Sequence, residues 1–369
     1  MTKRKRGVFV VELPCDEVLI HLFLFLTPKE RLTKIEPINK YFKSLLLCKM
    51  LWRNINLIHV KHLHPSFFIK YGHLISFLKL EHTWLSSISP YKNVNHFSSL
   101  RNIKHLNLLR TPFVRLDLLE DYLDSCASPN CSLKYLYLPK MYILSNTQRF
   151  SNNIFSILSR IRLKLLSISF HKSFFESDYS LYIWSLASNN LKKYIRKLQF
   201  LNFPCRDNAF ITTMVQQFQK LKHINLDFCQ LNTHQLNTVM AHVSKHITVF
   251  QAKFIEFNVG TMQLLSRFKD LRELTMCHVM HSNKEYKYLS TLKNLENIDI
   301  ISGSAFDFTC IENCKNLKQL TILRTRIINV RLFWDFIVKM DHIKFILSRY
   351  IVFDIIDNKN KIPSNVCLI

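Results

Sequence analysis

Apolar residues recur along most of the chain in one spacing, apolar-x-x-apolar-x-apolar, which begins near residue 75. Because alternate side chains of a strand point to opposite faces, each copy predicts one short strand with one buried face. The intervals between copies range from 32 residues, between positions 166 and 198, to 22, between positions 298 and 320. The central residues of the ten copies are Leu78, Leu106, Leu136, Leu166, Leu198, Ile224, Phe250, Leu274, Ile298 and Leu320. An eleventh, degraded copy is expected at Ile343 and Ile346, with Ser348 at its third position.

The stretch 221–231, LKHINLDFCQL, is the most complete copy of this pattern. It resembles the leucine-rich repeat, L-x-x-L-x-L-x-x-N/C-x-L, with Cys229 at the Asn/Cys position. A hydroxyl that can hydrogen-bond the turn after the strand occupies that position in three other copies, at Thr83, Thr111 and Thr325. Irregular turns are expected where it is taken by Met141, His171 or Val279.

The segments between copies have helical periodicity, with Leu236, Val239, Met240 and Val243 on one face as an example. One strand-and-helix unit cannot bury its own apolar face, whereas stacked units share a continuous core. An ordinary α/β domain is the alternative, but ten consecutive copies in register favour stacking. The predicted fold class is α/β, a leucine-rich-repeat solenoid of about ten to eleven repeats over residues 74–350.

A short helical segment precedes the repeats. Leu13-Pro14 places a proline in the first turn of a helix, where its missing N–H has no partner to lose. Thr27-Pro28-Lys29-Glu30 predicts a capping box that opens a second helix, and Pro37 opens a third. Three short helices cannot enclose the large apolar groups of this segment, so we expect one face to be buried by something else.

Residues 11 to 57 resemble the F-box, a small three-helix domain. The resemblance is carried by Leu13-Pro14, Glu17-Val18-Leu19, Leu22-Phe23 with Leu26, Lys40-Tyr41-Phe42 and Leu51-Trp52. The chain departs from the family at Pro37-Ile38-Asn39-Lys40, where Val-Cys-Lys often precedes the Phe, and this departure concerns the turn between the second and third helices.

The F-box resemblance implies a partner, the Skp adaptor, and through it a cullin ubiquitin ligase. The residues implied to dock the adaptor are Leu13, Pro14, Val18, Leu19, Leu22, Phe23, Leu26, Pro28, Leu32 and Ile35. The alternative is that this face packs on the first repeat, which is expected in part of Trp52 and Leu57 in either case.

An F-box followed by leucine-rich repeats resembles the substrate receptors of Skp–cullin–F-box ubiquitin ligases. Such a receptor is not an enzyme: it holds a target protein near the activated ubiquitin and so raises its effective concentration there for ubiquitination and proteasomal degradation. The target is expected on the concave face of the solenoid, where Tyr135 and Tyr137 flank Leu136 as an aromatic anchor. The candidate substrate-binding residues are His105, Asn107, Tyr135, Tyr137, Lys197, Gln199, His223, Asn225, Gln251 and Glu273.

A basic column precedes these positions by one residue. Its members are Lys104, Lys134, Lys164, Arg196, Lys222, Arg272 and Lys318. Two interpretations stay open: the column solubilises one edge of the solenoid, or it attracts an acidic or phosphorylated segment of a partner.

The composition excludes or disfavours several other classes of function. The formal net charge is +25, which suits acidic partners, but the basic residues are spread along the chain, so nucleic acid is not the favoured partner. With 4 glycines, far apart, the chain has no Gly-rich phosphate loop. The 10 cysteines form no CxxC pair, and His59, His62 and His64 have no acidic or thiol neighbour, so we expect no metal and no cofactor.

The predicted domain limits follow from these patterns. They are a basic N-terminal tail (1–8), the F-box (9–58), a linker (59–73), the leucine-rich repeats (74–350) and a C-terminal cap or tail (351–369). No secretory signal and no membrane-spanning run is found, which predicts a cytoplasmic or nuclear protein with free thiols. The rival function is a basic leucine-rich-repeat scaffold that binds nucleic acid or acidic partners without a role in degradation.

Overall fold

The computed structural model describes most of the chain. The described residues are 15–60, 65–82, 97–111, 116–128, 131–141, 154, 156–170, 191–201, 216–277, 286–302, 306, 308–327, 330–348 and 363–369.

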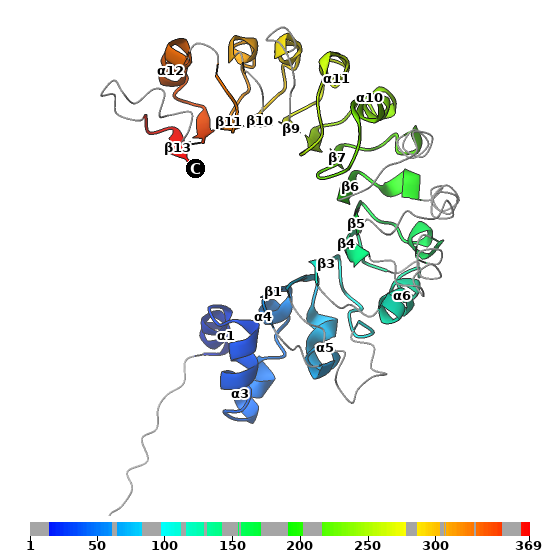
Figure 1. Cartoon of the computed structure of the whole chain (residues 1–369). Helices are drawn as coiled ribbons and strands as arrows, with labels where there is room; N and C mark the ends of the chain where they lie inside the picture. The colour runs from blue at the N-terminus through cyan, green and yellow to red at the C-terminus, as the bar shows by residue number, and fades with distance from the viewer. Residues whose placement is uncertain are drawn as a thin grey trace, which may run out of the picture.

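In the described part of the chain, thirteen parallel strands form one sheet in chain order, from β1 to β13. The sheet lines the inside of an open arc, and helices lie along the outside (Figure 1). The strands are β1 (Asn54–Ile58), β2 (Phe77–Glu81), β3 (His105–Arg110), β4 (Tyr135–Met141), β5 (Leu165–Phe170), β6 (Lys197–Leu201), β7 (His223–Asn225), β8 (Val249–Ala252), β9 (Glu273–Cys277), β10 (Asn297–Ile301), β11 (Gln319–Leu323), β12 (Lys344–Leu347) and β13 (Val366–Leu368).

Helices occupy the N-terminal end and the convex side. The N-terminal helices are α1 (Asp16–Leu24), α2 (Pro28–Glu30), η1 (Arg31–Ile35), α3 (Lys40–Leu45) and α4 (Lys49–Trp52). The helices between and after the strands are α5 (Pro65–Tyr71), η2 (Gly72–Leu74), α6 (Leu116–Ser125), α10 (Thr233–His242), α11 (Val259–Leu265), η4 (Tyr286–Thr291), η5 (Phe308–Ile311) and α12 (Val330–Lys339).

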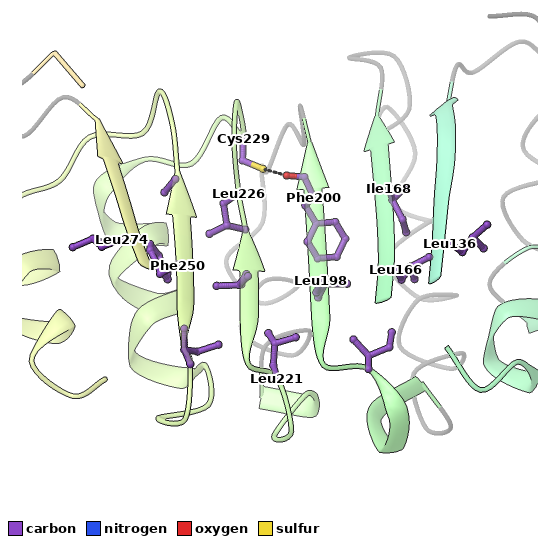
Figure 2. Close-up of a cluster of buried hydrophobic side chains, with 14 of the residues drawn as sticks. Leu136, Leu166, Ile168, Leu198, Phe200, Leu221, Leu226, Cys229, Phe250 and Leu274 are labelled. Carbon is purple, nitrogen blue, oxygen red and sulfur yellow. Dashed lines mark hydrogen bonds between the residues drawn. The ribbon is translucent and has the colours of Figure 1, made fainter. Parts of the chain in front are cut away.

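Equivalent positions of neighbouring repeats are paired across the sheet, as Leu106 with Leu136 and Leu166 with Leu198 show. At the three apolar positions of the ten predicted copies, every side chain is at most 3% exposed. Their side chains meet between the strands and the convex segments in one continuous row (Figure 2). The predicted α/β solenoid is therefore the fold of the described residues.

The predicted register of the eleventh copy is wrong by one residue. Leu320 pairs with Phe345 and Ile322 pairs with Leu347, and both partners are fully buried. Ile346 instead lies on the half-exposed inner face. The run Lys344–Leu347 offers two possible alternations, and pairing with β11 selects the one that buries the Phe.

The sheet also extends beyond the predicted repeats at both ends. β1 lies inside the segment predicted as F-box (9–58), and its Ile55 and Leu57 are buried. β13 lies inside the predicted cap or tail (351–369) and pairs with β12. The predicted linker (59–73) includes α5.

The turn after the strand uses the predicted side chains. The Cys229 thiol donates to the Phe200 carbonyl at 3.1 Å (Figure 2), and the Thr111 hydroxyl donates to the Leu80 carbonyl at 2.9 Å. Thr325 bonds the Leu323 carbonyl within its own repeat at 3.0 Å. Met141 still belongs to β4, whereas Thr83, His171 and Val279 lie outside the described residues.

The N-terminal helices are continuous with the solenoid. Trp52 is fully buried, stacks on Tyr71 at 4.2 Å between ring centroids and meets Phe67 edge-on at 5.7 Å. The Glu36 carboxylate pairs with Lys70 and accepts a hydrogen bond from the Tyr71 hydroxyl. Leu57, inside β1, pairs with Leu80 of the first predicted repeat, as expected, whereas Trp52 packs on α5 within the predicted linker.

Candidate protein-binding surfaces

Helix α1 carries an apolar face that the rest of the described chain leaves uncovered. Val18 is 46% exposed, Leu22 is 52% exposed and Phe25, just after the helix, is 87% exposed. The spacing i, i+4, i+7 places these three side chains on one side of the helix. The N-terminal helical segment has five further exposed apolar residues: Leu24, Ile38, Tyr41, Leu47 and Met50.

The ten residues implied for adaptor docking divide into four groups. Leu13 and Pro14 lie outside the described residues. Val18 and Leu22 are exposed, whereas Leu19 and Phe23 are 6% and 5% exposed and pack in the core, so they support the face instead of forming it. The remaining four are half-buried: Leu26, Pro28, Leu32 and Ile35.

Arg31 holds the N-terminal helices together from inside. Its guanidinium donates to the Phe23 carbonyl at 2.8 Å, to the Leu24 carbonyl at 3.2 Å and to the Leu51 carbonyl. It also lies over the Trp52 ring at 5.6 Å. Burial lowers the pKa of Arg31, and the side chain is 6% exposed. The carbonyls at the end of α1 are thus satisfied by one cation, a role that the sequence analysis missed.

Two local contacts fix the ends of these helices. The predicted capping box is present, because the Glu30 N–H donates to the Thr27 hydroxyl at 3.2 Å and the Glu30 carboxylate accepts from the Thr27 N–H at 3.0 Å. A hydrogen bond from Lys34 and those from Thr27 lower the pKa of Glu30 to about 2. The Tyr41 hydroxyl donates to Asp16 at 2.5 Å and joins α3 to the start of α1.

The concave face consists of the strand positions that alternate with the buried ones. All ten candidate substrate-binding residues lie there, on β3, β4 and β6 to β9. Lys197 and Glu273 are exposed and Asn225 is buried, while seven are half-buried: His105, Asn107, Tyr135, Tyr137, Gln199, His223 and Gln251.

An aromatic cluster occupies the N-terminal part of this face. The His105 ring stacks on Tyr137 at 5.2 Å and on Tyr135 at 5.5 Å, and Phe77 lies 4.3 Å from it on the other side. Burial lowers the pKa of His105 and so favours the neutral imidazole. Burial also raises the pKa of Tyr137. The anchor predicted for the two tyrosines is therefore built around a histidine as well.

A polar network follows on the next strands. The Asn225 amide donates to Gln251 at 2.7 Å, and the Asp227 carboxylate accepts the Lys253 N–H at 2.9 Å. Burial, with the nearby Lys197 charge, lowers the pKa of His223 to about 4. Amide groups, a His223 side chain of lowered pKa and the Asp227 carboxylate thus face the middle of the arc.

The turns that end the strands expose two stacked ring pairs. Phe228 and Phe254 stack at 4.5 Å and are 49% and 53% exposed, and His59 and His82 stack at 4.9 Å. All four residues have positive φ, between 48° and 61°. All four occupy the same repeat position, two residues after the last core-facing side chain of the strand. Counting two residues on from the last apolar position of each repeat would therefore have located them in the sequence.

Neither a metal-binding group nor a membrane-spanning helix is found in the described part of the chain. Among these residues, no group of three or more His, Cys, Asp or Glu could hold a metal ion. No helix in the described part is both long and apolar enough to cross a membrane. The described cysteines are free thiols. Of the three histidines considered for metal binding, His62 and His64 lie outside the described residues.

Similarity to known proteins is found among solved structures and not in sequence. No family model matches the chain, and no curated protein matches it in sequence. Among solved structures, an internalin (inlF) from Listeria monocytogenes is similar over 92% of each chain, with a TM-score of 0.47 and 11% identity. A leucine-rich-repeat protein from Leptospira interrogans covers 82% of this chain and 97% of its own (TM-score 0.31, 12% identity), and LegL7 from Legionella pneumophila covers 67% and 90% (TM-score 0.36, 14% identity).

The sheet itself defines the class. Thirteen parallel strands in chain order, paired at equivalent positions of one repeated pattern, are the architecture of a leucine-rich-repeat solenoid. Solenoids of this class present an extended concave surface to other macromolecules.

Proposed function

We propose that the chain is the substrate-recognition subunit of a Skp–cullin–F-box ubiquitin ligase. Its N-terminal helices dock the Skp adaptor, and its concave face binds a target protein for ubiquitination. The proposal places the protein in the cytoplasm or the nucleus, where such ligases act. The F-box pattern and the order of helices before repeats motivate it.

The observation that carries the proposal is the apolar face of Val18, Leu22 and Phe25. These side chains lie on one side of α1 and are between 46% and 87% exposed. Exposed apolar groups gathered on one face mark an interaction site or else an aggregation liability. A partner surface that covers them removes the liability, which is the role of the adaptor in the F-box family.

The architecture supports a receptor that holds its target at a fixed distance from the adaptor-docking face. Trp52, Tyr71 and the Glu36–Lys70 pair join the helices to the first repeat, so the docking face and the concave face belong to one continuous structure. A rigid connection holds a bound target at a set position relative to the ligase, which is the source of effective concentration.

Binding of the purified Skp adaptor by calorimetry tests the proposal. Burial of a large apolar side chain contributes about 1.5–3 kcal/mol, so Leu22→Asp with Phe25→Asp weakens binding about a hundredfold or more. The matched control replaces Val259 and Val338, which are 50% and 57% exposed on the solenoid, by Asp. Wild-type affinity in the control and loss in the α1 variant support the proposal, whereas equal affinity in all three chains contradicts it.

The rival function is a basic scaffold for nucleic acid or acidic partners that takes no part in degradation. The net charge of +25 favours it. It predicts that the adaptor is not bound at all, and it leaves the exposed face of α1 without a role.

A further inference from the structure

A row of five cations follows one edge of the sheet in its N-terminal half. We call these residues the basic rim: Lys104, Lys134, Lys164, Arg196 and Lys222. Each directly precedes a strand, from β3 to β7. Their backbones are bonded in series: the N–H of Lys134 donates to the Lys104 carbonyl at 2.9 Å, and the same bond recurs at each later step up to Lys222, at 2.7 to 2.9 Å. The five residues are therefore immediate neighbours.

The basic rim has no acidic partner within the described part of the chain. No ion pair joins any of its five residues to a carboxylate there. The same column is neutralised further along, because Glu296 pairs with Arg272 at 3.3 Å and with Lys318 at 2.6 Å. A purely solubilising column would not need to differ between the two halves.

The strands beside the basic rim also lack acidic residues. None of the segments that form β3 to β7 contains Asp or Glu, and Lys197 adds an exposed cation on β6. Carboxylates of the concave face flank this stretch instead: Glu81 on β2 pairs with Lys79 and Arg110, Asp227 follows β7 and pairs with Lys253, and Glu273 and Asp299 lie on β9 and β10. Within the described strands, β3 to β7 therefore form the stretch without a carboxylate.

We propose that the basic rim binds an extended acidic segment of a protein partner, which runs across β3 to β7 along the solenoid. Strands lie about 4.8 Å apart, so five of them span about 19 Å, which an extended chain of about six residues covers. Glutamate and aspartate side chains at alternate positions face the row of cations. This inference names the target class of the proposed receptor and rests on that function only for the consequence of binding.

The spacing of the charges favours carboxylates over phosphate and over nucleic acid. Phosphate carries nearly two charges at one point and is bound by converging Arg side chains, whereas the basic rim presents one charge per strand in a line. Single-stranded nucleic acid needs aromatic platforms along its path. The Phe and Tyr rings of the described concave strands lie on β2 to β4, where Phe77 and Tyr135 already pack against His105.

Fluorescence anisotropy with labelled peptides tests this inference on the full chain without any adaptor. The probe is a peptide of alternating glutamate and alanine, and its neutral counterpart has glutamine for glutamate. A phosphoserine–alanine peptide and an oligothymidine of similar charge are the competing ligands. We expect the glutamate peptide to bind best, with an affinity that falls as salt rises.

The decisive variant is Lys134→Gln, Lys164→Gln, Arg196→Gln, and its control is Lys245→Gln, Lys269→Gln, Lys315→Gln. The control removes the same charge from exposed positions outside the basic rim. We expect at least about a tenfold loss in the rim variant and little change in the control. Equal loss in both, no binding to wild type, or preference for the phosphopeptide or the oligonucleotide overturns the inference.

The two proposals fail separately. If the adaptor binds and the glutamate peptide does not, this inference is wrong while the receptor function stands. If the peptide binds and the adaptor does not, the basic rim is a site for acidic segments in a protein of another function.

Discussion

Phe250 is the residue whose truncation should most clearly weaken a single interface between repeats of the solenoid. Its side chain is fully buried in β8, and its ring lies 6.1 Å from Phe268 and 6.4 Å from Phe257. In a solenoid each repeat contacts only its neighbours, so damage at one interface is not shared by the whole molecule. β7, the strand before it, has only 3 residues and adds little pairing to compensate.

The cost of Phe250→Ala follows from these contacts. Truncation of a buried Phe costs about 3–5 kcal/mol, and the two ring pairs place this site in the upper part of that range. Phe250→Leu keeps most of the volume and should cost about 1–2 kcal/mol. Phe254→Ala is the matched control, because this ring is 53% exposed, and it should cost under about 1 kcal/mol.

Urea unfolding followed by circular dichroism measures all three variants, and limited proteolysis locates the weakened interface. We expect Phe250→Ala to lose about 4 kcal/mol and to be cleaved near β7 and β8 before the ends of the arc unfold. The predicted role of Phe250 is wrong if Phe250→Ala lowers the free energy of unfolding no more than Phe254→Ala does. It is also wrong if Phe250→Leu lowers it as much as Phe250→Ala.

Two further predictions concern the basic side chains of Arg31 and His223. Arg31→Met leaves the Phe23, Leu24 and Leu51 carbonyls without their donor and should lower the free energy of unfolding in urea by about 3 kcal/mol. The control Lys34→Met changes an exposed side chain and should alter stability by under about 0.5 kcal/mol. Similar losses in the two variants would contradict the role of Arg31. Because the pKa of His223 falls from 6.5 to about 4 on folding, the folded state binds this proton more weakly than the unfolded state, so stability is full above pH 6.5 and is lost as pH falls toward 4, by up to about 3 kcal/mol. In thermal melts from pH 7 to 4, the wild type should therefore lose more stability toward the acid end than His223→Gln, and parallel pH profiles would show that His223 makes no such contribution.

The strand positions could be predicted because burial in this fold repeats every second residue. A triplet such as Leu221, Ile224 and Leu226 leaves one register in which all three side chains face the core. The end strands lack that constraint: β12 contains three apolar residues in a row, and β1 has two inward residues within NINLI next to a helix. Their place was decided by pairing with the neighbouring strand, which no local pattern records.

The surfaces were predictable in location but less so in composition. Helical spacing located the apolar face of α1, yet it could not tell that Leu19 and Phe23 face inward while Phe25 projects from the C-terminal end. Arg31 resembles any surface arginine in the sequence, because its partners are backbone carbonyls eight and twenty residues away. The contrast between the two halves of the basic column depends on which cations lie beside Glu296, which only the stacked repeats establish.

One measurement tests the receptor function most directly. Size-exclusion chromatography with light scattering is run on a mixture of this chain, purified Skp adaptor and the adaptor-binding fragment of a cullin. We predict a single complex that contains one copy of each, and its loss when Leu22 and Phe25 are replaced by Asp. Elution of the wild-type chain apart from an intact adaptor–cullin complex would contradict it.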